Sequence, residues 1–196
     1  MDPHDADADA VLEFWFGTPG SPEAATQRPQ WFRKDAAFDA AIAQRFGAQI
    51  EGALQGALAH WAAAPGSALA QIVVLDQFTR NAFRGTARAF AGDVRALAAA
   101  QAMVGAGQDL ALPPLRRAFV YLPYEHAEIL AMQDEAVRLY TRLAAAAPGF
   151  ESMLDYAQRH HAVIARFGRF PHRNAALGRA STPDEIAFLA EPGSGF

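Results

Sequence analysis

The chain has 196 residues, of which 52% are hydrophobic and 19% are charged, and its formal net charge at pH 7 is −4. This length fits one domain or a tight pair, and we expect a single all-helical domain over residues 1–196, with flexible termini at about 1–6 and 191–196. The negative charge argues against general nucleic-acid binding, the lack of Cys excludes a thiolate nucleophile and Cys-ligated zinc, and no apolar run is long enough to span a membrane.

The first predicted elements are two helices joined by a Pro- and Gly-rich loop. The acidic residues 1–7 lack the positive region that a signal peptide needs, so we expect a cytoplasmic protein. Asp7 or Asp9 is expected to cap the first helix, which Gly17 ends. Asp35 is expected to cap a second helix, which is rich in Ala.

A central helix covers the stretch 72–86, in which apolar side chains point in every direction at helical spacing. Ser67 is expected to cap this helix, and Gly85 is expected to end it. One stripe of the helix is polar at i, i+4 and i+8, with two amides beside it: Asp76, Arg80, Arg84, Gln77 and Asn81. Because buried charge persists only when it is paired, hydrogen-bonded or facing a ligand, the stretch predicts a polar site inside a helical protein.

The second half of the chain is also predicted to be helical. Thr86 is expected to cap the next helix, and Pro123 to start another that runs to about Ala147. A further helix is expected over 150–167. The run Thr182-Pro183-Asp184-Glu185 carries a cap, a Pro at the first helical position and a Glu that can complete a capping box, so it predicts the start of a last helix.

Most of the arginines fall in three stretches that contain no acidic residue: 77–92, 110–124 and 156–183. Arg presents a planar fork that suits carboxylate or phosphate. If the three stretches converge, they form an anion-binding pocket. The alternative is that Asp76, Glu125, Glu128 and helix C-termini take these arginines as structural partners.

Four motifs resemble a bacterial family catalogued as domain of unknown function 924: Trp15-Phe16-Gly17, the run from Leu75 to Thr86, the run from Tyr121 to Glu128, and the run from Arg166 to Asn174. The likeness covers nearly the whole chain in the right order. It implies an all-α fold, a compact right-handed tetratricopeptide-like superhelical array of helices, and no established activity. Thr79 stands where the family usually has Pro, and Ala127 where Ser is common.

Several chemistries are compatible with these residues. The run Glu125-His126-x-Glu128 with His160, His161 or His172 suggests a metal site, but no His-Glu-x-x-His motif is present, and we expect no metal and no cofactor. No Ser lies in a Gly-x-Ser-x-Gly context. General acid–base catalysis by Asp76, His126 or His172 is the remaining catalytic hypothesis.

We expect an internal pocket that binds an anionic small molecule or a peptide carboxylate. Arg80 and Arg173 are predicted to meet in it, because each lies in a basic segment that reads Arg-Asn-Ala. The alternatives are a hydrolase or lyase that uses Asp76 and a His as an acid–base pair, and a helical interaction scaffold. The low charge content also leaves a surface for homo-oligomer formation. The predicted ligand-binding residues are Asp76, Gln77, Arg80, Asn81, Arg84, Glu125, His126, His160, Arg169, His172, Arg173 and Asn174.

Overall fold

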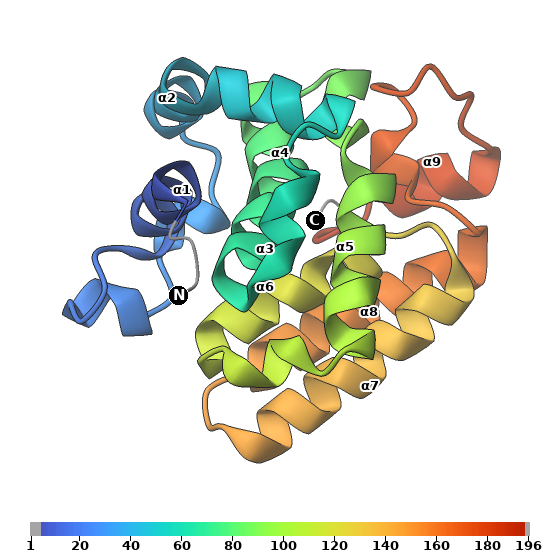
Figure 1. The fold of residues 1–196 in the computed structure, drawn as a ribbon. Helices are drawn as coiled ribbons and strands as arrows, with labels where there is room; N and C mark the ends of the chain where they lie inside the picture. Colours follow the sequence, from blue (N-terminus) through green and yellow to red (C-terminus); the bar gives the residue numbers. More distant parts are fainter. Residues whose placement is uncertain (1–4, 195–196) are drawn as a thin grey trace. The chain divides into compact units, whose positions relative to one another are not determined.

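The structure, a computed structural model, describes residues 5–194 apart from the side chain of Ala25. Over these residues the chain forms helices and turns and no β-strand, which confirms the all-α prediction (Figure 1). The chain divides into two compact units: unit 1 comprises Met1–Arg84 and Arg88–Pro123, and unit 2 comprises Gly85–Ala87 and Tyr124–Phe196. The single domain and the tetratricopeptide-like superhelix remain predictions. No helix within residues 5–194 has the length and apolar character needed to cross a membrane.

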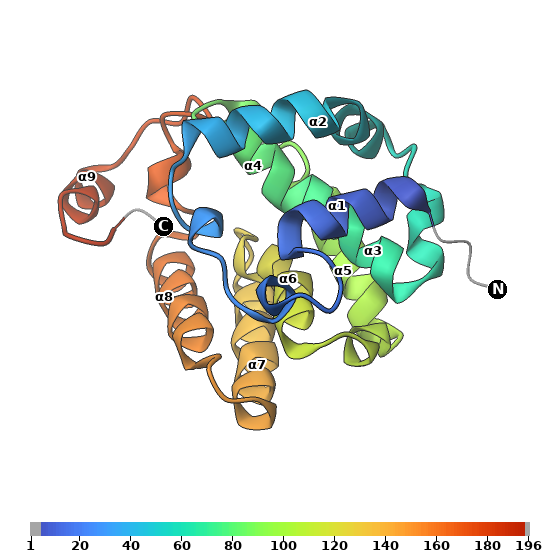
Figure 2. The ribbon, with the colours of Figure 1, turned by 90° about the vertical axis from the view of Figure 1, so that its left-hand side faces the viewer.

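Unit 1 contains the following α-helices: α1 (Ala6–Phe16), α2 (Ala36–Gln55), α3 (Pro65–Ile72), α4 (Thr79–Ala82), α5 (Asp93–Gly105) and α6 (Pro114–Glu125), whose last two residues belong to unit 2. In Figure 2, α1 lies along α3, and α2 lies across α4. The side chain of Asp35 caps α2, as predicted. The cap of α1 is Asp5, which accepts from the N–H groups of Asp7 and Ala8, so the prediction of Asp7 or Asp9 was wrong.

Aromatic side chains from several elements form the core of unit 1. The ring of Trp15 on α1 lies 5.6 Å from that of Phe78 and 5.8 Å from that of Phe119. The indole N–H of Trp31 donates to the carbonyl of Trp15 at 3.1 Å, which ties the loop after α1 to this core. Ring pairs at these separations add stabilisation beyond their buried area.

The central helix runs from Pro65 to Ala82 through α3, a π-helical segment η4 (Val73–Phe78) and α4. Its N-cap is Ala64, not Ser67 as predicted, because Pro65 already supplies the first helical residue. The hydroxyl of Ser67 instead donates to the carbonyls of Trp61 and Ala64. The predicted cap Thr86 was also wrong: a 3₁₀ turn, η5 (Ala87–Phe90), follows it, and α5 begins only at Asp93.

The π-helical segment changes the hydrogen-bond register in the middle of the central helix. The N–H of Thr79 donates to the carbonyl of Val74, five residues earlier. The hydroxyl of Thr79 donates to the carbonyl of Leu75 at 2.7 Å. Gly92 packs against that same carbonyl so closely that a Cβ at position 92 would lie 2.1 Å from the Leu75 oxygen. Segments of this kind are often found at functional sites.

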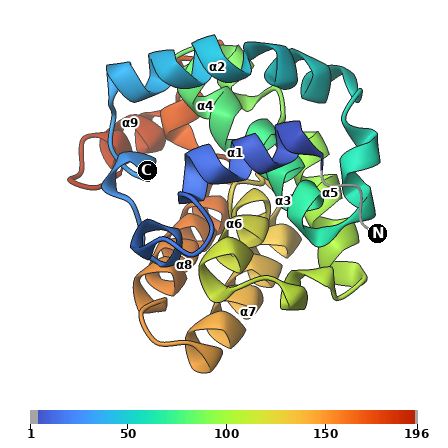
Figure 3. The ribbon, with the colours of Figure 1, turned by 60° about the vertical axis from the view of Figure 1, so that its left-hand side comes forward.

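Unit 2 contains α7 (Leu130–Ala146), α8 (Glu151–Phe167) and the short α9 (Pro183–Leu189). Figure 3 shows α7 and α8 side by side as an antiparallel pair. The capping box of Thr182 and Glu185 starts α9, as predicted. Pro123 does not start a helix as predicted: it lies inside α6, where its missing N–H costs one hydrogen bond only two residues before the helix ends.

The expected flexible termini fall partly outside the described residues. Residues 1–4 and 195–196 lie outside them. Of the rest, Ala6 is already helical in α1, and the hydroxyl of Ser194 donates to the carbonyl of Leu189 at 3.1 Å.

Candidate functional site

The two units divide the predicted site residues between them. Unit 1 holds Asp76, Gln77, Arg80, Asn81 and Arg84. Unit 2 holds Glu125, His126, His160, Arg169, His172, Arg173 and Asn174. The meeting of Arg80 and Arg173 in one pocket remains a prediction, and the polar groups of each unit are described separately.

In unit 1, Arg80 lies between two carboxylates. Its NH1 atom is 3.0 Å from Oδ1 of Asp76, which is 1% exposed, and 2.9 Å from Oδ1 of Asp93 at the start of α5. It also donates to the backbone carbonyl of Asp76 at 2.6 Å. Burial lowers the pKa of Arg80, but the charges of Asp76 and Asp93 outweigh this effect and raise it overall. The guanidinium is therefore charged and neutralised by carboxylates of its own unit.

The rest of the polar stripe is paired in the same way. Arg84 donates through Nε and NH2 to the two carboxylate oxygens of Asp39 at 2.7 and 2.8 Å, and Asn81 donates to Oδ1 of Asp39 at 2.7 Å. Burial raises the pKa of Asp39, and these bonds more than offset it, so the pKa is lowered. Gln77 donates to Oδ2 of Asp76 at 2.6 Å. These contacts favour the interpretation of Arg80 and Arg84 as structural partners.

In unit 2, Glu125 at the end of α6 meets His160 in the middle of α8. Both residues are buried, with 4% and 5% of their surface exposed. Nδ1 of His160 lies 2.9 Å from the carbonyl oxygen of Tyr156 and 3.1 Å from Oε1 of Glu125. Because both neighbours of Nδ1 are acceptors, Nδ1 carries the ring proton, and in the neutral imidazole Nε2 keeps a lone pair.

The surroundings of His160 favour this neutral form. Burial lowers its pKa most, and the nearby His126, Arg173 and His172 lower it further, to about 3. The hydrogen bond to the Tyr156 carbonyl acts in the opposite direction. At neutral pH, His160 is therefore an uncharged base inside a helical unit.

Basic side chains gather around the fully buried ring of Phe170. The ring of His160 lies 5.4 Å from that of Phe170, the ring of His172 lies 5.6 Å from it, and Cζ of Arg173 is 4.4 Å from its centroid. The ring of His126 is 6.2 Å from that of His160. We call these five residues the Phe170 cluster. They come from three segments: the turn directly after α6, the middle of α8, and Phe170 with the 3₁₀ turn η7 (Pro171–Arg173) that it precedes.

Arg169 and Asn174 are brought together around a different carboxylate, that of Glu185 on α9. Arg169 donates to both oxygens of Glu185, at 2.6 and 2.8 Å, and Asn174 donates to Oε2 at 3.2 Å. The bonds from Arg169 and from the N–H of Thr182 lower the pKa of Glu185 to about 2. The pair therefore stays charged at any physiological pH.

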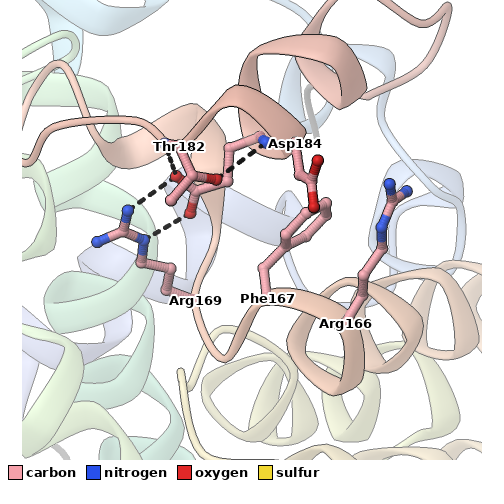
Figure 4. A pocket seen from close by; sticks show the side chains of 6 residues that line it. Arg166, Phe167, Arg169, Thr182 and Asp184 are labelled. Carbon is pink, nitrogen blue, oxygen red and sulfur yellow. Dashed lines mark hydrogen bonds and ion pairs between the residues drawn. The ribbon is translucent and has the colours of Figure 1, made fainter.

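An open pocket of about 490 Å³ lies beside this ion pair, lined by Arg166, Phe167, Arg169, Thr182, Asp184 and Glu185. Figure 4 shows Phe167 between Arg166 and Arg169, with Arg169 bonded to the carboxylate of α9. Both positive and negative side chains line the pocket, and the guanidinium of Arg169 already donates to Glu185. The pocket therefore presents both signs of charge to a ligand.

Five charged residues that organise the two units were not among the predicted ligand-binding residues. Asp39 and Asp93 pair with Arg84 and Arg80 across long stretches of sequence, and no local pattern marks them. A signal existed for the others. Glu128 ends the run Glu125-His126-x-Glu128, Arg179 lies in the acid-free stretch 156–183, and Glu185 completes the predicted capping box.

The histidines and carboxylates do not assemble into a metal site in the part of the chain that the structure covers. Among residues 5–194, no group of three or more His, Asp or Glu side chains is placed to hold a metal ion. Glu128, one of the suggested ligands, has both oxygens bonded to the guanidinium of Arg179.

Comparisons with known proteins identify the family and no activity. A family model described as a bacterial protein of unknown function (DUF924) matches residues 11–193. No curated protein matches the chain. A solved structure of a protein of unknown function, ATU0120 from Agrobacterium tumefaciens, is similar with a TM-score of 0.82 and 38% sequence identity, over 94% of this chain and 97% of that one. The chain therefore belongs to the bacterial DUF924 family, whose function is unknown.

Proposed function

We propose that the Phe170 cluster of unit 2 binds an anionic small molecule or a peptide carboxylate. The observation that carries this proposal is the gathering of His160, His172 and Arg173 about the buried ring of Phe170, with the ring of His126 next to that of His160. Polar side chains of this kind are costly to bury, and a cluster from three segments indicates that they serve a common purpose.

Arg173 is the proposed anchor for the anion. It is 5% exposed, and its guanidinium lies 4.4 Å from the Phe170 ring centroid, a separation at which the ring face attracts and orients the cation. A guanidinium fixed in this way presents N–H donors with the planar geometry of a carboxylate. The imidazoles add donors or acceptors that adapt to the ligand.

Arg80 is not part of the proposed anchor. In unit 1 it already contacts Asp76 and Asp93, and both carboxylates neutralise it. We therefore assign Arg80 a structural role and expect the anion response to depend on Arg173.

Thermal melting with sulfate, phosphate and succinate tests the proposal. A ligand that binds only the folded protein stabilises it by about 2.7 kcal/mol at 100 times its dissociation constant, so the wild type should melt at a higher temperature with at least one of these anions. Arg173→Ala should lose this response. The control Arg138→Ala removes an exposed partner of Glu135 on α7 and should keep it. The proposal is wrong if no anion stabilises the wild type or if Arg173→Ala responds equally.

A second candidate, acid–base catalysis by a hydrolase or lyase, is favoured by the Glu125–His160 contact. A carboxylate that holds Nδ1–H fixes the tautomer and leaves Nε2 to accept a proton, as in Ser-His-Asp triads. Glu125 suits this role better than Asp76, whose oxygens contact Arg80 and Gln77. Turnover in a screen of anionic metabolites, lost in His160→Asn, would support catalysis. Anion binding with no turnover would leave a binding protein.

A further inference from the structure

We propose that Glu128 and Arg179 are positioning residues for the Phe170 cluster. Their ion pair fixes the segment 168–182, so that His172 and Arg173 stay beside His160. This inference rests on the proposed function, because it explains how the site that would bind the anion is held in shape.

The pair holds both backbone polar groups of Phe170. The N–H of Phe170 donates to Oε1 of Glu128 at 2.8 Å. The carbonyl of Phe170 accepts from NH2 of Arg179 at 3.1 Å. The ring at the centre of the cluster is therefore anchored through its own peptide groups.

The Glu128–Arg179 pair also holds the C-terminal part of the segment 168–182. NH1 and NH2 of Arg179 donate to the two oxygens of Glu128 at 2.6 and 2.9 Å. Nε of Arg179 donates to Oδ1 of Asn174 at 3.0 Å, and the backbone N–H of Arg179 donates to the Asn174 carbonyl at 2.8 Å. All three guanidinium nitrogens are thus used to join positions 170, 174 and 179 to one carboxylate.

Glu128 lies in the connection between α6 and α7, three residues after Glu125. Its contacts therefore tie the segment that carries Glu125 and His126 to the segment that carries His172 and Arg173. The remaining member of the cluster, His160, is held by α8 and by its bond to the Tyr156 carbonyl. The Glu128–Arg179 pair joins two of the three segments that form the cluster.

The carboxylate of Glu185 also holds the residues next to the turn η7. Glu185 accepts from Arg169 and Asn174, so the residues on both sides of η7 are anchored. His172 and Arg173 lie between these anchors, on a turn of only three residues. A short turn held at both ends has few alternative conformations, which reduces the entropy that ligand binding must overcome.

Glu128 is suited to positioning rather than to binding an anion. Burial raises its pKa, but the hydrogen bonds from Arg179 and Phe170 and the charges of Arg179 and Arg173 more than offset this, so the pKa is lowered. The group is therefore a carboxylate at neutral pH. A carboxylate repels an anion, so Glu128 acts on the ligand only through the residues that it holds.

The test uses Glu128→Gln and Arg179→Lys, with sulfate as the probe. Gln keeps an acceptor for the Phe170 N–H while it removes the charge that binds Arg179. Glu135→Gln, which alters an exposed pair with Arg138 on α7, is the matched control. The measurements are the sulfate dissociation constant, the exchange rate of the Phe170 amide, and the imidazole resonances of His172 without ligand.

Both variants should bind sulfate about tenfold more weakly than the wild type, as expected for the loss of a charge-assisted hydrogen bond. Their Phe170 amide should exchange about tenfold faster, and the His172 resonances should move, while helix content stays that of the wild type. The control should match the wild type in each measurement.

Two failures are distinguishable. If the wild type binds sulfate and both variants bind it equally well with His172 unmoved, the positioning role is overturned and the proposed function stands. If the wild type binds no sulfate, the proposed function is overturned. The His172 resonances then decide the positioning role: a shift in both variants supports it, and unchanged resonances overturn it.

Discussion

At the scale of single residues, the two units accommodate buried polar groups in different ways. In unit 1, Arg80 is charged and lies between Asp76 and Asp93. In unit 2, His160 is neutral, since burial and neighbouring basic groups disfavour its cation. The first arrangement pairs buried charges, and the second keeps a buried imidazole uncharged. Substitutions at the two positions should therefore differ in their effects.

Removing Arg80 should destabilise the fold. In Arg80→Ala, Asp76 would stay buried and lose the guanidinium of Arg80, and breaking a buried ion pair typically costs about 3–5 kcal/mol. The matched control is Arg88→Ala, because Arg88 and its partner Glu51 are both about half exposed and such pairs contribute at most about 1 kcal/mol. Urea unfolding followed by circular dichroism measures both values. If both variants lose the same free energy of unfolding, the contact between Asp76 and Arg80 does not stabilise the fold more than an exposed ion pair does.

His160 should make stability depend on pH. Its pKa is about 3 in the folded state and about 6.5 when unfolded, so between these values the unfolded chain binds more protons. Stability is therefore fully present above pH 6.5 and falls as the pH drops toward 3, with a slope of at most about 1.4 kcal/mol per pH unit from this residue.

The variant His160→Asn isolates this contribution, because Asn keeps an N–H donor for Tyr156 and Glu125 but cannot take up a proton in this range. Unfolding at several pH values should show a smaller slope for the variant than for the wild type. The groups near His160 that also titrate or carry charge are Glu125, His126, His172 and Arg173, and they are the same in both proteins. Identical slopes would contradict the depressed pKa.

At the scale of secondary-structure elements, the central helix depends on the fit between η4 and the start of α5. In the π-helical register the N–H of Thr79 donates to the carbonyl of Val74, and its hydroxyl donates to the carbonyl of Leu75. Gly92 packs directly on the Leu75 carbonyl. The backbone of Gly92 has φ −86, so the close approach rather than the conformation requires glycine here.

Gly92→Ala should therefore be destabilising. Its Cβ would lie 2.1 Å from a backbone oxygen, and relieving such an overlap typically costs about 1–3 kcal/mol or more. Gly47→Ala is the control, because nothing lies within 4 Å of a Cβ at Gly47, inside α2, and Ala should stabilise that helix by about 0.5–1 kcal/mol. Thermal melting of the two variants should shift in opposite directions. An unchanged melting temperature in Gly92→Ala would show that the backbone around Leu75 can move aside without loss of stability.

Elements whose signals are local could be predicted from the sequence, and those that depend on distant contacts could not. Asp35 and Thr182 cap helices as predicted, because each cap side chain accepts from backbone N–H groups no more than three residues further along the chain. The π-helical register of η4 could not be predicted, since it involves packing against Gly92. In the same way, the sequence predicted that Asp76 and Arg80 lie on one face of the helix, but it did not predict that Asp93 is the second carboxylate beside Arg80.

The prediction of the site was limited for the same reason. The sequence indicated that His160 and Arg173 belong to a polar site, because they lie in a long basic stretch without acids. The sequence also offered Glu128 as a partner for the arginines, but its bond to the N–H of Phe170 and the central place of that ring depend on contacts between segments that are about 40 residues apart.

At the scale of the whole molecule, the proposed anion-binding residues all lie in unit 2. The sequence contains six histidines, and three of them belong to the Phe170 cluster. Two others have unrelated acidic partners: His60 lies 3.2 Å from Asp5 in unit 1, and His161 lies 2.8 Å from Asp134 on α7. The histidines therefore supply both probes and internal controls within one protein.

The most direct test of the central claim is a sulfate titration at constant ionic strength, followed through the imidazole resonances by nuclear magnetic resonance. We predict that the resonances of His126, His160 and His172 shift together and saturate with one dissociation constant, and that those of His60 and His161 stay in place. In Arg173→Ala the saturable shift should disappear. The account is contradicted if the three cluster histidines do not respond, or if His60 and His161 shift along with them, because the anion would then bind elsewhere or only nonspecifically.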